Sequence, residues 1–386
     1  MIRIVCYEDV HLWIFGKFAL RMHENLLLLG KSADIAKQGT ASAQVAHRIA
    51  YSGPNEKLSP VETLMITHLD TSEKIFYVKE RLELYDMGIC MSADHRRFLV
   101  TAGLPQNRLC YVNPAQDGVL KPRPIVFGIA SKVHDDGRKN EWSIVKALKG
   151  FPPDFCILKI MGGGWEPQVA ALRSHGITVE YYDQFDYEIY TKTFMPSLDY
   201  FLYFSHDEGS MAYLDAIAAD VKVIATPQGF HLDIRDGIDH IVTDMHDVAA
   251  VFRKLLHERE GRTARVSGWT WLEYAWRHLV VWDYLTLKSS PDTVAEQSTF
   301  MKLLPSLDPR YAPSLLSEFV YSPVPDLDAL LVAGGIAQKG GLANAAAQFN
   351  RMALVFYPKS EDAYEKVSRL YPSYLALACP QKHINA

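Results

Sequence analysis

The segment that is most informative about the fold is residues 198–247, LDYFLYFSHDEGSMAYLDAIAADVKVIATPQGFHLDIRDGIDHIVTDMHD. An apolar run of strand length at 200–204 is followed by a polar turn and by apolar residues at helical spacing from 211 to 219. A second apolar run at 221–225 ends in the turn TPQG. Because parallel strands end at one edge of a sheet, both turns are predicted to border one crevice. A helix N-terminus there offers free N–H groups to an anion.

Two acidic residues make this stretch more specific. Glu208 stands just before the predicted helix, and Asp215 lies on it seven residues later, about two helical turns away. Carboxylates at this edge would suit a hydroxyl-rich ligand. The structural alternative is that the helix dipole favours Glu208 and that Asp215 is a solvated surface charge.

The stretch resembles the pattern S-x-x-E-G-x-G-x-x-x-L-E-A-x-A-x-G-x-P-V-I-A-T of the retaining glycosyltransferases of the GT-B class, family 4 type. The matching positions are Ser205, Glu208, Gly209, Leu214, Asp215, Ala216, Ala218, Val223, Ile224, Ala225 and Thr226. The resemblance implies that Glu208 contacts the transferred sugar and that Gly209, Ser210 and Asp215 bind the nucleotide sugar.

The chain departs from the family pattern at several positions. The family has two glutamates eight residues apart, so either the turn has lost one residue or Asp207 takes the first acidic role. Ser210 and Ala219 also replace glycines of the pattern.

Composition narrows the functional class. The chain has 386 residues, enough for two domains, and its net charge of -5 argues against nucleic acid as the main partner. Its five cysteines form no C-x-x-C pair, which favours reduced thiols, and no metal-ligand spacing is visible. The first residues predict a strand, not a signal peptide, and no apolar run is long enough to span a membrane. We therefore expect a cytoplasmic protein.

A basic loop precedes the first helix of the second half of the chain. Residues 131–140 stand where the family has G-R-x-x-x-x-K-G, whose Arg and Lys neutralise the donor diphosphate; Lys139 matches the lysine, and Lys132 or Arg138 would replace the arginine. The alternative is a solvated basic loop. Gly163 lies in a tight turn near the nucleotide, and Gln184 lies in the segment that resembles the family's border of the base.

In the first half, His68 and Asp70 follow a predicted strand at 64–67. The resemblance places sugar or acceptor contacts there, so both residues are candidates for the reaction centre. The alternative is that Asp70 or Thr71 caps the next helix and that His68 is structural. The helix predicted at 10–29 faces the core or, alternatively, the inner surface of a membrane.

Alternating strands and helices predict two parallel, doubly wound sheets. The predicted fold class is therefore α/β, with two Rossmann-like domains facing a cleft as in GT-B enzymes and a small helical extension. The expected domains are 1–121 for the acceptor and 122–268 for the nucleotide sugar. A closing helix at 269–290 follows, and then an appendage at 291–386 that resembles one tetratricopeptide unit over 330–368. The appendage would pack on the enzyme, on a second copy or on another protein.

The sequence thus predicts a metal-independent retaining glycosyltransferase of the hexosyltransferase type, without a cofactor. It would use a nucleotide-diphosphate sugar and a glycan, a lipid-linked or a small-molecule acceptor, and the resemblance suggests surface glycan or polysaccharide assembly. Two alternatives stay open: a nucleotide-sugar 2-epimerase of the same fold, and a catalytically degenerate fold that acts as a binding module.

Overall fold

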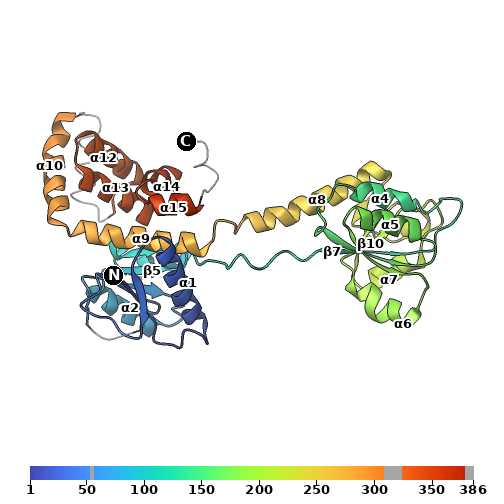
Figure 1. Ribbon diagram of the computed structural model, residues 1–386, viewed down its shortest axis with the longest axis horizontal. Helices are drawn as coiled ribbons and strands as arrows, with labels where there is room; N and C mark the ends of the chain where they lie inside the picture. Colours follow the sequence, from blue (N-terminus) through green and yellow to red (C-terminus); the bar gives the residue numbers. More distant parts are fainter. Residues whose placement is uncertain (53–55, 308–323, 379–386) are drawn as a thin grey trace. The chain divides into compact units, whose positions relative to one another are not determined.

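The chain folds into two compact units (Figure 1). The computed structural model describes residues 1–52, 56–307 and 324–378. The first unit joins Met1–Gly118 with Gly268–Ala386, and the second is Val119–Ser267. The sequence placed domain limits after residues 121 and 268. In the structure, the helices after residue 290 belong to the same unit as the first sheet.

The first unit contains a six-stranded parallel sheet with the order β2-β1-β3-β4-β5-β6. Its strands are β1 (Ile2–Val5), β2 (Ala33–Ala36), β3 (Val45–Arg48), β4 (Val61–Ile66), β5 (Met87–Cys90) and β6 (Leu109–Tyr111). The sequence analysis did not predict β2 and β3. Each has only four residues, and β3 contains His47 and Arg48, which are buried in spite of their polarity. Arg48 lies 3.0 Å from Glu62 in β4, so its burial depends on a partner in a neighbouring strand.

Three helices connect these strands: α1 (Ile14–Leu28), α2 (Ser72–Leu84) and α3 (Ala93–Thr101), with the short η1 (Gln106–Arg108) before β6. Side-chain caps start two of them, because Thr71 accepts the Lys74 N–H and Ser92 accepts the His95 N–H. Helix α1 begins four residues later than predicted and packs against α9 (Trp271–Lys288).

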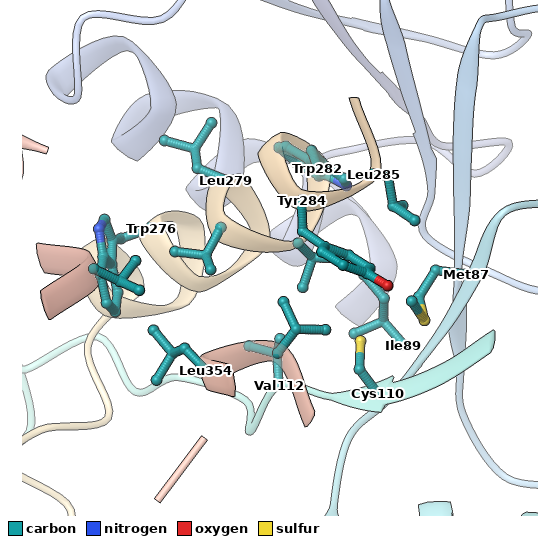
Figure 2. Packing of buried hydrophobic residues seen from close by; sticks show 14 of the residues in the cluster. Met87, Ile89, Cys110, Val112, Trp276, Leu279, Trp282, Tyr284, Leu285 and Leu354 are labelled. Carbon is teal, nitrogen blue, oxygen red and sulfur yellow. The ribbon is translucent and has the colours of Figure 1, made fainter. Parts of the chain in front are cut away.

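Helix α9 has buried contacts on two sides. Trp282 donates from Nε1 to Thr63 Oγ1 in β4 at 2.9 Å, whereas the ring of Trp276 stacks on Tyr374, with 4.6 Å between ring centroids. Figure 2 shows side chains of α9 beside residues of β5 and β6 and beside Leu354. The helix predicted to close the fold therefore forms the centre of the first unit's core.

The C-terminal helices complete that core. They are α10 (Pro291–Leu307), α12 (Leu327–Lys339), α13 (Ala343–Phe356), α14 (Glu361–Ser368) and α15 (Pro372–Ala378). Gly334 lets α12 approach α13, because a Cβ atom there would lie 2.6 Å from Asn350 Oδ1. The repeat-like stretch 330–368 covers most of α12, all of α13 and all of α14. Residues 308–323 and 379–386 of the predicted appendage, Cys379 included, lie outside the described residues.

The second unit has a six-stranded parallel sheet with the order β12-β11-β10-β7-β8-β9. The strands are β7 (Ile125–Ala130), β8 (Cys156–Met161), β9 (Thr178–Tyr182), β10 (Tyr200–Tyr203), β11 (Lys222–Ala225) and β12 (His240–Ile241). Strands β8 and β9 extend to one side of β7 and strands β10, β11 and β12 to the other, which is the doubly wound Rossmann order. The predicted α/β fold with two parallel sheets and surrounding helices is confirmed, although the order β2-β1-β3-β4-β5-β6 of the first sheet differs from that of the second.

Helices cover both faces of this second sheet. The elements are α4 (Glu141–Leu148), α5 (Glu166–Ser174), α6 (Tyr187–Ile189), η2 (Tyr190–Phe194), η3 (Met195–Ser197), α7 (Met211–Ala218), η4 (Gly229–Asp233) and α8 (Met245–Ala264). Helices α4, α5 and α8 contribute to one buried cluster, and η2 and α7 contribute to the other. The sheet reverses its order between β7 and β10, so the loops after these two strands flank its topological switch point.

In the described parts of the chain, Cys6, Cys90, Cys110 and Cys156 are free and buried. Burial raises the pKa of the Cys90 and Cys156 thiols to about 12. Across the same residues, no helix combines the length and apolarity that crossing a bilayer requires.

Candidate functional site at the switch point of the second sheet

The loops after β7 and β10 are bonded to each other. The carbonyl of Arg138 accepts the His206 N–H at 3.0 Å and the Ser205 hydroxyl at 3.1 Å. Asn140, with a left-handed φ of 50°, donates from Nδ2 to the Phe204 carbonyl at 2.8 Å. These contacts hold the basic loop predicted from the sequence against the turn that contains the acidic residues.

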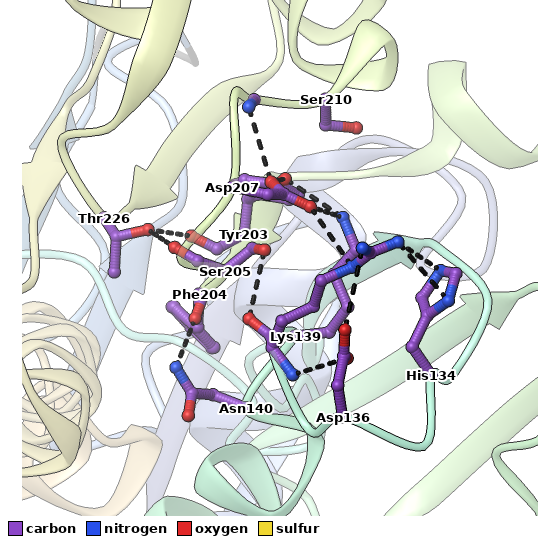
Figure 3. A network of polar contacts seen from close by, with 12 residues as sticks. His134, Asp136, Lys139, Asn140, Tyr203, Phe204, Ser205, Asp207, Ser210 and Thr226 are labelled. Atoms are coloured by element: carbon purple, nitrogen blue, oxygen red, sulfur yellow. Dashed lines mark hydrogen bonds and ion pairs between the residues drawn. The ribbon is translucent and has the colours of Figure 1, made fainter.

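Lys139 is the best-connected cation of this site (Figure 3). Its Nζ lies 2.5 Å from Asp207 Oδ2 and 3.1 Å from the Tyr203 hydroxyl, and Tyr203 also donates to Asp207. Burial lowers the pKa of Lys139, but its bonds to Asp207 and Tyr203 outweigh burial and leave that pKa raised. Burial would raise the pKa of Asp207, yet the bonds from Lys139 and Tyr203 hold it well below the ordinary value. Both groups are therefore charged at neutral pH.

The other two predicted cations are more exposed. Arg138 Nε lies 3.9 Å from Asp207 Oδ2, and the guanidinium group is also 3.6 Å from Asp136. Lys132 is exposed and forms no ion pair with any residue that the structure describes. Arg138 is thus near Lys139, and Lys132 is an uncommitted charge on the same loop.

Glu208 is exposed, and its position is set through its main chain. The Glu208 carbonyl accepts the Phe230 N–H at 3.2 Å, and a Cβ atom on Gly229 would lie 2.0 Å from that carbonyl oxygen. Gly209 has a φ of +117°, and a Cβ atom there would lie 2.7 Å from the Phe230 ring. Glycine is therefore required on both sides of this contact. The two turns that the sequence placed at one crevice are interlocked.

The sequence analysis missed His231 and Tyr203. His231 is 1% exposed, and its Nε2 accepts the N–H of Ser210 at 3.0 Å. Its ring stacks on Tyr213, with 3.9 Å between centroids. The only sequence signal was a histidine two residues after a turn glycine, and Tyr203 read as an ordinary strand residue.

Asp215 lies on the exposed side of α7, where it accepts a hydrogen bond of 2.8 Å from the Tyr190 hydroxyl. Gly163 belongs to a turn pressed against the loop after β7, since a Cβ atom on the adjacent Gly162 would lie 2.3 Å from the Ser131 carbonyl oxygen. Gln184 is exposed in the segment after β9. The predicted nucleotide-sugar residues therefore lie in loops, turns and one helix at the carboxyl edge of this sheet. Lys139 and Arg138 contact Asp207 directly, and Ser210 is linked to them through the rings of His231 and Tyr203.

His68 and Asp70 belong to the first unit and follow β4. Both are exposed. Asp70 forms an ion pair with Lys74, which lowers its pKa, and Thr71 is the cap of α2. Of the two alternatives for capping, the structure has Thr71.

The described residues include no group of three or more His, Cys, Asp or Glu side chains that could hold a metal ion.

Comparison of the sequence with protein-family profiles and with curated proteins gives no match. The structure of this chain is similar to several solved structures. They include the lipopolysaccharide outer core galactosyltransferase WaaB in its apo form, with 14% identity, a TM-score of 0.31, and coverage of 69% of this chain and 80% of that one. WaaG, a glycosyltransferase involved in lipopolysaccharide biosynthesis, is 13% identical to this chain with a TM-score of 0.31. The match covers 71% of this chain and 94% of WaaG. HepE of Anabaena, in complex with UDP and glucose, is 10% identical to this chain with a TM-score of 0.30. The match covers 71% of this chain and 93% of HepE. At these identities and TM-scores, the likeness carries no argument about what this chain binds.

Proposed function

We propose that this chain is a retaining glycosyltransferase whose second unit binds a nucleotide-diphosphate sugar. The observation that carries the proposal is the position of Lys139, a half-buried cation next to the switch point of a Rossmann-ordered sheet. Ligands of open α/β sheets bind at this point. The motif in residues 205–226, whose resemblance to the family pattern suggests the reaction, lies around the same switch point.

The donor diphosphate would be bound by Lys139 together with Arg138 or Lys132. Main-chain N–H groups at the start of α7, next to Gly209 and Ser210, would add the positive end of the helix dipole. These groups together can neutralise a diphosphate without a metal ion. Gly163 and Gln184 would border the rest of the nucleotide.

Two carboxylates would have different roles. Asp215 would accept hydrogen bonds from the ribose hydroxyls, and its bond to Tyr190 fixes the direction of the carboxylate. Glu208 would contact the transferred sugar and stabilise the positive charge that develops at the anomeric carbon. Asp207 is the alternative for this second role, because it follows the same strand one residue earlier.

During transfer, the bond between the anomeric carbon and the phosphate oxygen breaks, and its electron pair leaves with the diphosphate. The cations of the basic loop stabilise the charge that this oxygen gains. The acceptor oxygen forms the new bond on the same face of the sugar and passes its proton to the departing diphosphate oxygen. The first unit would bind the acceptor, with His68 and Asp70 as candidate contacts.

A thermal-shift screen of nucleotide sugars tests the proposal. A donor present at 100 times its Kd adds about 2.7 kcal/mol to the free energy of unfolding. The shift should become smaller in Lys139→Ala and should be kept in Lys146→Ala, a substitution on α4 outside the basic loop. Absence of a shift with every nucleotide sugar and every nucleoside diphosphate would contradict the proposal.

The reaction type needs a second measurement. Release of nucleoside diphosphate should increase when a pool of acceptors is added, whereas an epimerase would need no acceptor and a binding module would release none. NMR of the product should show the anomeric configuration of the donor. An inverted product would refute retention.

A further inference from the structure

The segment after β11 is bonded to the loop that carries Glu208. Phe230 donates its N–H to the Glu208 carbonyl, and His231 accepts the N–H of Ser210. The Tyr213 hydroxyl donates in turn to the His231 carbonyl at 3.2 Å, so α7 holds the histidine backbone. Thr226 Oγ1, at the end of β11, donates to the Ser205 carbonyl at 2.7 Å. The position of residues 205–210 therefore depends on a second segment about twenty residues away.

The bond between Ser210 and His231 requires one protonation state. A main-chain N–H can donate only to a ring nitrogen that has a free lone pair, so Nε2 must be unprotonated. The neutral imidazole then has its proton on Nδ1. In the imidazolium form both ring nitrogens are donors, and the Ser210 N–H would face another N–H group.

We propose that His231 is a positioning residue for the proposed transfer reaction, which as a neutral imidazole holds the loop of Glu208, Gly209 and Ser210 in its working place and on protonation releases it. The role in turnover rests on the proposed function, whereas the role in holding the loop does not. His231 does not touch the reacting atoms; it acts through the main chain of Ser210.

The surroundings of His231 favour the neutral form. Burial among the rings of Tyr203, Tyr213 and Phe230 lowers the pKa of His231. The backbone of Thr226 and the carboxylate of Asp207 oppose this shift, whereas the ammonium group of Lys139 adds to it. The Ser210 N–H, which can donate only to the unprotonated ring nitrogen, also favours the neutral form. The folded pKa lies below 6.5, so the neutral form holds the loop at neutral pH, and the loop is released as the pH falls through the folded pKa.

The loop itself can be measured by NMR in the full chain. We expect Nε2 of His231 to be unprotonated at about pH 7.5 and to take up a proton as the pH falls. Protection of the Ser210 amide against hydrogen exchange, taken relative to the intrinsic exchange rate at each pH, should decrease over the same pH range. His231→Leu should show fast exchange at every pH, whereas the amide oxygen of His231→Gln accepts the Ser210 N–H at every pH and should keep exchange slow. A protonated Nε2 near neutral pH, or slow exchange in a folded His231→Leu variant, would overturn the proposal.

Turnover with the nucleotide sugar that gives the largest thermal shift tests the second part. Wild-type turnover should fall on the acid side as His231 is protonated, and this fall should be absent from His231→Gln. His231→Leu should lose roughly 10- to 100-fold in turnover throughout, because a displaced catalytic loop costs about that much. His240→Gln is the control, since His240 in β12 is a partly buried histidine of the same unit that also has a lowered pKa, and it should keep the acid fall.

An acid fall that persists in His231→Gln would overturn the role in turnover even where the exchange data agree with a held loop. If no nucleotide sugar binds, the proposed function is wrong, and the exchange measurement alone decides whether His231 holds the loop.

Discussion

Asp207 and a bound diphosphate would compete for the ammonium group of Lys139. Asp207 now lies 2.5 Å from Lys139 Nζ, and its low pKa keeps it ionised at any pH near neutrality. A phosphate that approaches Lys139 therefore meets a carboxylate as well as an ammonium group. Like charges at short distance oppose binding.

Substitution of the two partners should change affinity in opposite directions. Lys139→Ala should weaken binding of a nucleoside diphosphate by roughly 1.5 to 3 kcal/mol, the contribution of a charged hydrogen bond. Asp207→Asn should tighten it by about 1 kcal/mol, or about fivefold, because the repelling charge is gone and Lys139 is free. Calorimetry with the nucleoside diphosphate that gives the largest thermal shift measures both, and Asp135→Asn, an exposed acid on the same loop, is the control. Weaker binding in Asp207→Asn would show that Asp207 helps to bind the ligand.

Turnover separates Asp207 from Glu208. Glu208→Gln keeps the shape of the side chain and removes its charge, so the loss should occur mainly in kcat if Glu208 interacts more strongly with the transition state than with the donor. Affinity for the same nucleoside diphosphate should not change. A nearly silent Glu208→Gln together with an inactive Asp207→Asn would assign the catalytic role to Asp207.

The motif located this site, but it could not give the contacts within it. Lys139, Arg138, Asp207 and Glu208 stand in short runs that the family pattern marks. Tyr203 and His231 take part because the fold brings residues 64 and 21 positions apart into hydrogen-bonding distance. A sequence read in local windows contains no signal for such pairs.

Among the elements, those of the second unit were the most predictable. Strands β7, β8, β9 and β10 are mainly apolar segments that alternate with helices, and this alternation is the pattern from which the sheet was predicted. In the first unit β3 was not, because its polar residues are buried only through partners elsewhere: His47 contacts Thr63 Oγ1 at 2.9 Å, and Arg48 pairs with Glu62. Burial of a polar group is compensated by contacts that a single strand does not contain.

Two buried histidines, one in β3 and one in α9, should make the stability of the first unit depend on pH. The rings of His47 and His278 are 4.9 Å apart, and both are fully buried. Burial lowers the pKa of both, to about 4 for His278. Their folded pKa values lie below the unfolded value, so the unfolded state binds more protons between these values. Their contribution to the free energy of unfolding is fully present above about pH 6.5, and it decreases as the pH falls toward the folded pKa.

For His278 alone the linkage lowers the free energy of unfolding by about 2 kcal/mol between neutral pH and pH 5. His47 should act in the same direction. Denaturant unfolding at the two pH values measures the sum, and His278→Gln should reduce the dependence, while His11→Gln, on an exposed loop, should leave it unchanged. Equal stability of the wild type at both pH values would contradict the buried, neutral state of this pair.

In the whole molecule, the first unit is built from two segments that are separated in the sequence by the second unit. The first sheet, α9 and the C-terminal helices share one buried cluster, although the second unit separates them along the chain. Trp276 of α9 contacts the rings of Tyr364, Tyr371 and Tyr374, all from the last two described helices and the turn between them. The extension, which the sequence showed as an appendage, supplies part of the core of the first unit.

Truncation tests this interdependence. A chain cut after Ser290 would expose Trp276 and the adjoining face of α9, and loss of the contacts around one buried tryptophan alone costs about 3 to 5 kcal/mol. Domains are stable by about 5 to 15 kcal/mol, so removal of the whole layer of helices should leave the first unit without a cooperative unfolding transition. Residues 119–267, expressed alone, keep both of their buried clusters and should unfold cooperatively. They should also bind the nucleoside diphosphate selected by the thermal-shift screen with the affinity of the full chain. Calorimetric melts of both fragments beside the full-length Trp276→Ala variant make the comparison. A fragment 1–290 that melts cooperatively near the temperature of the intact protein would show that the C-terminal helices cover a core that is complete without them.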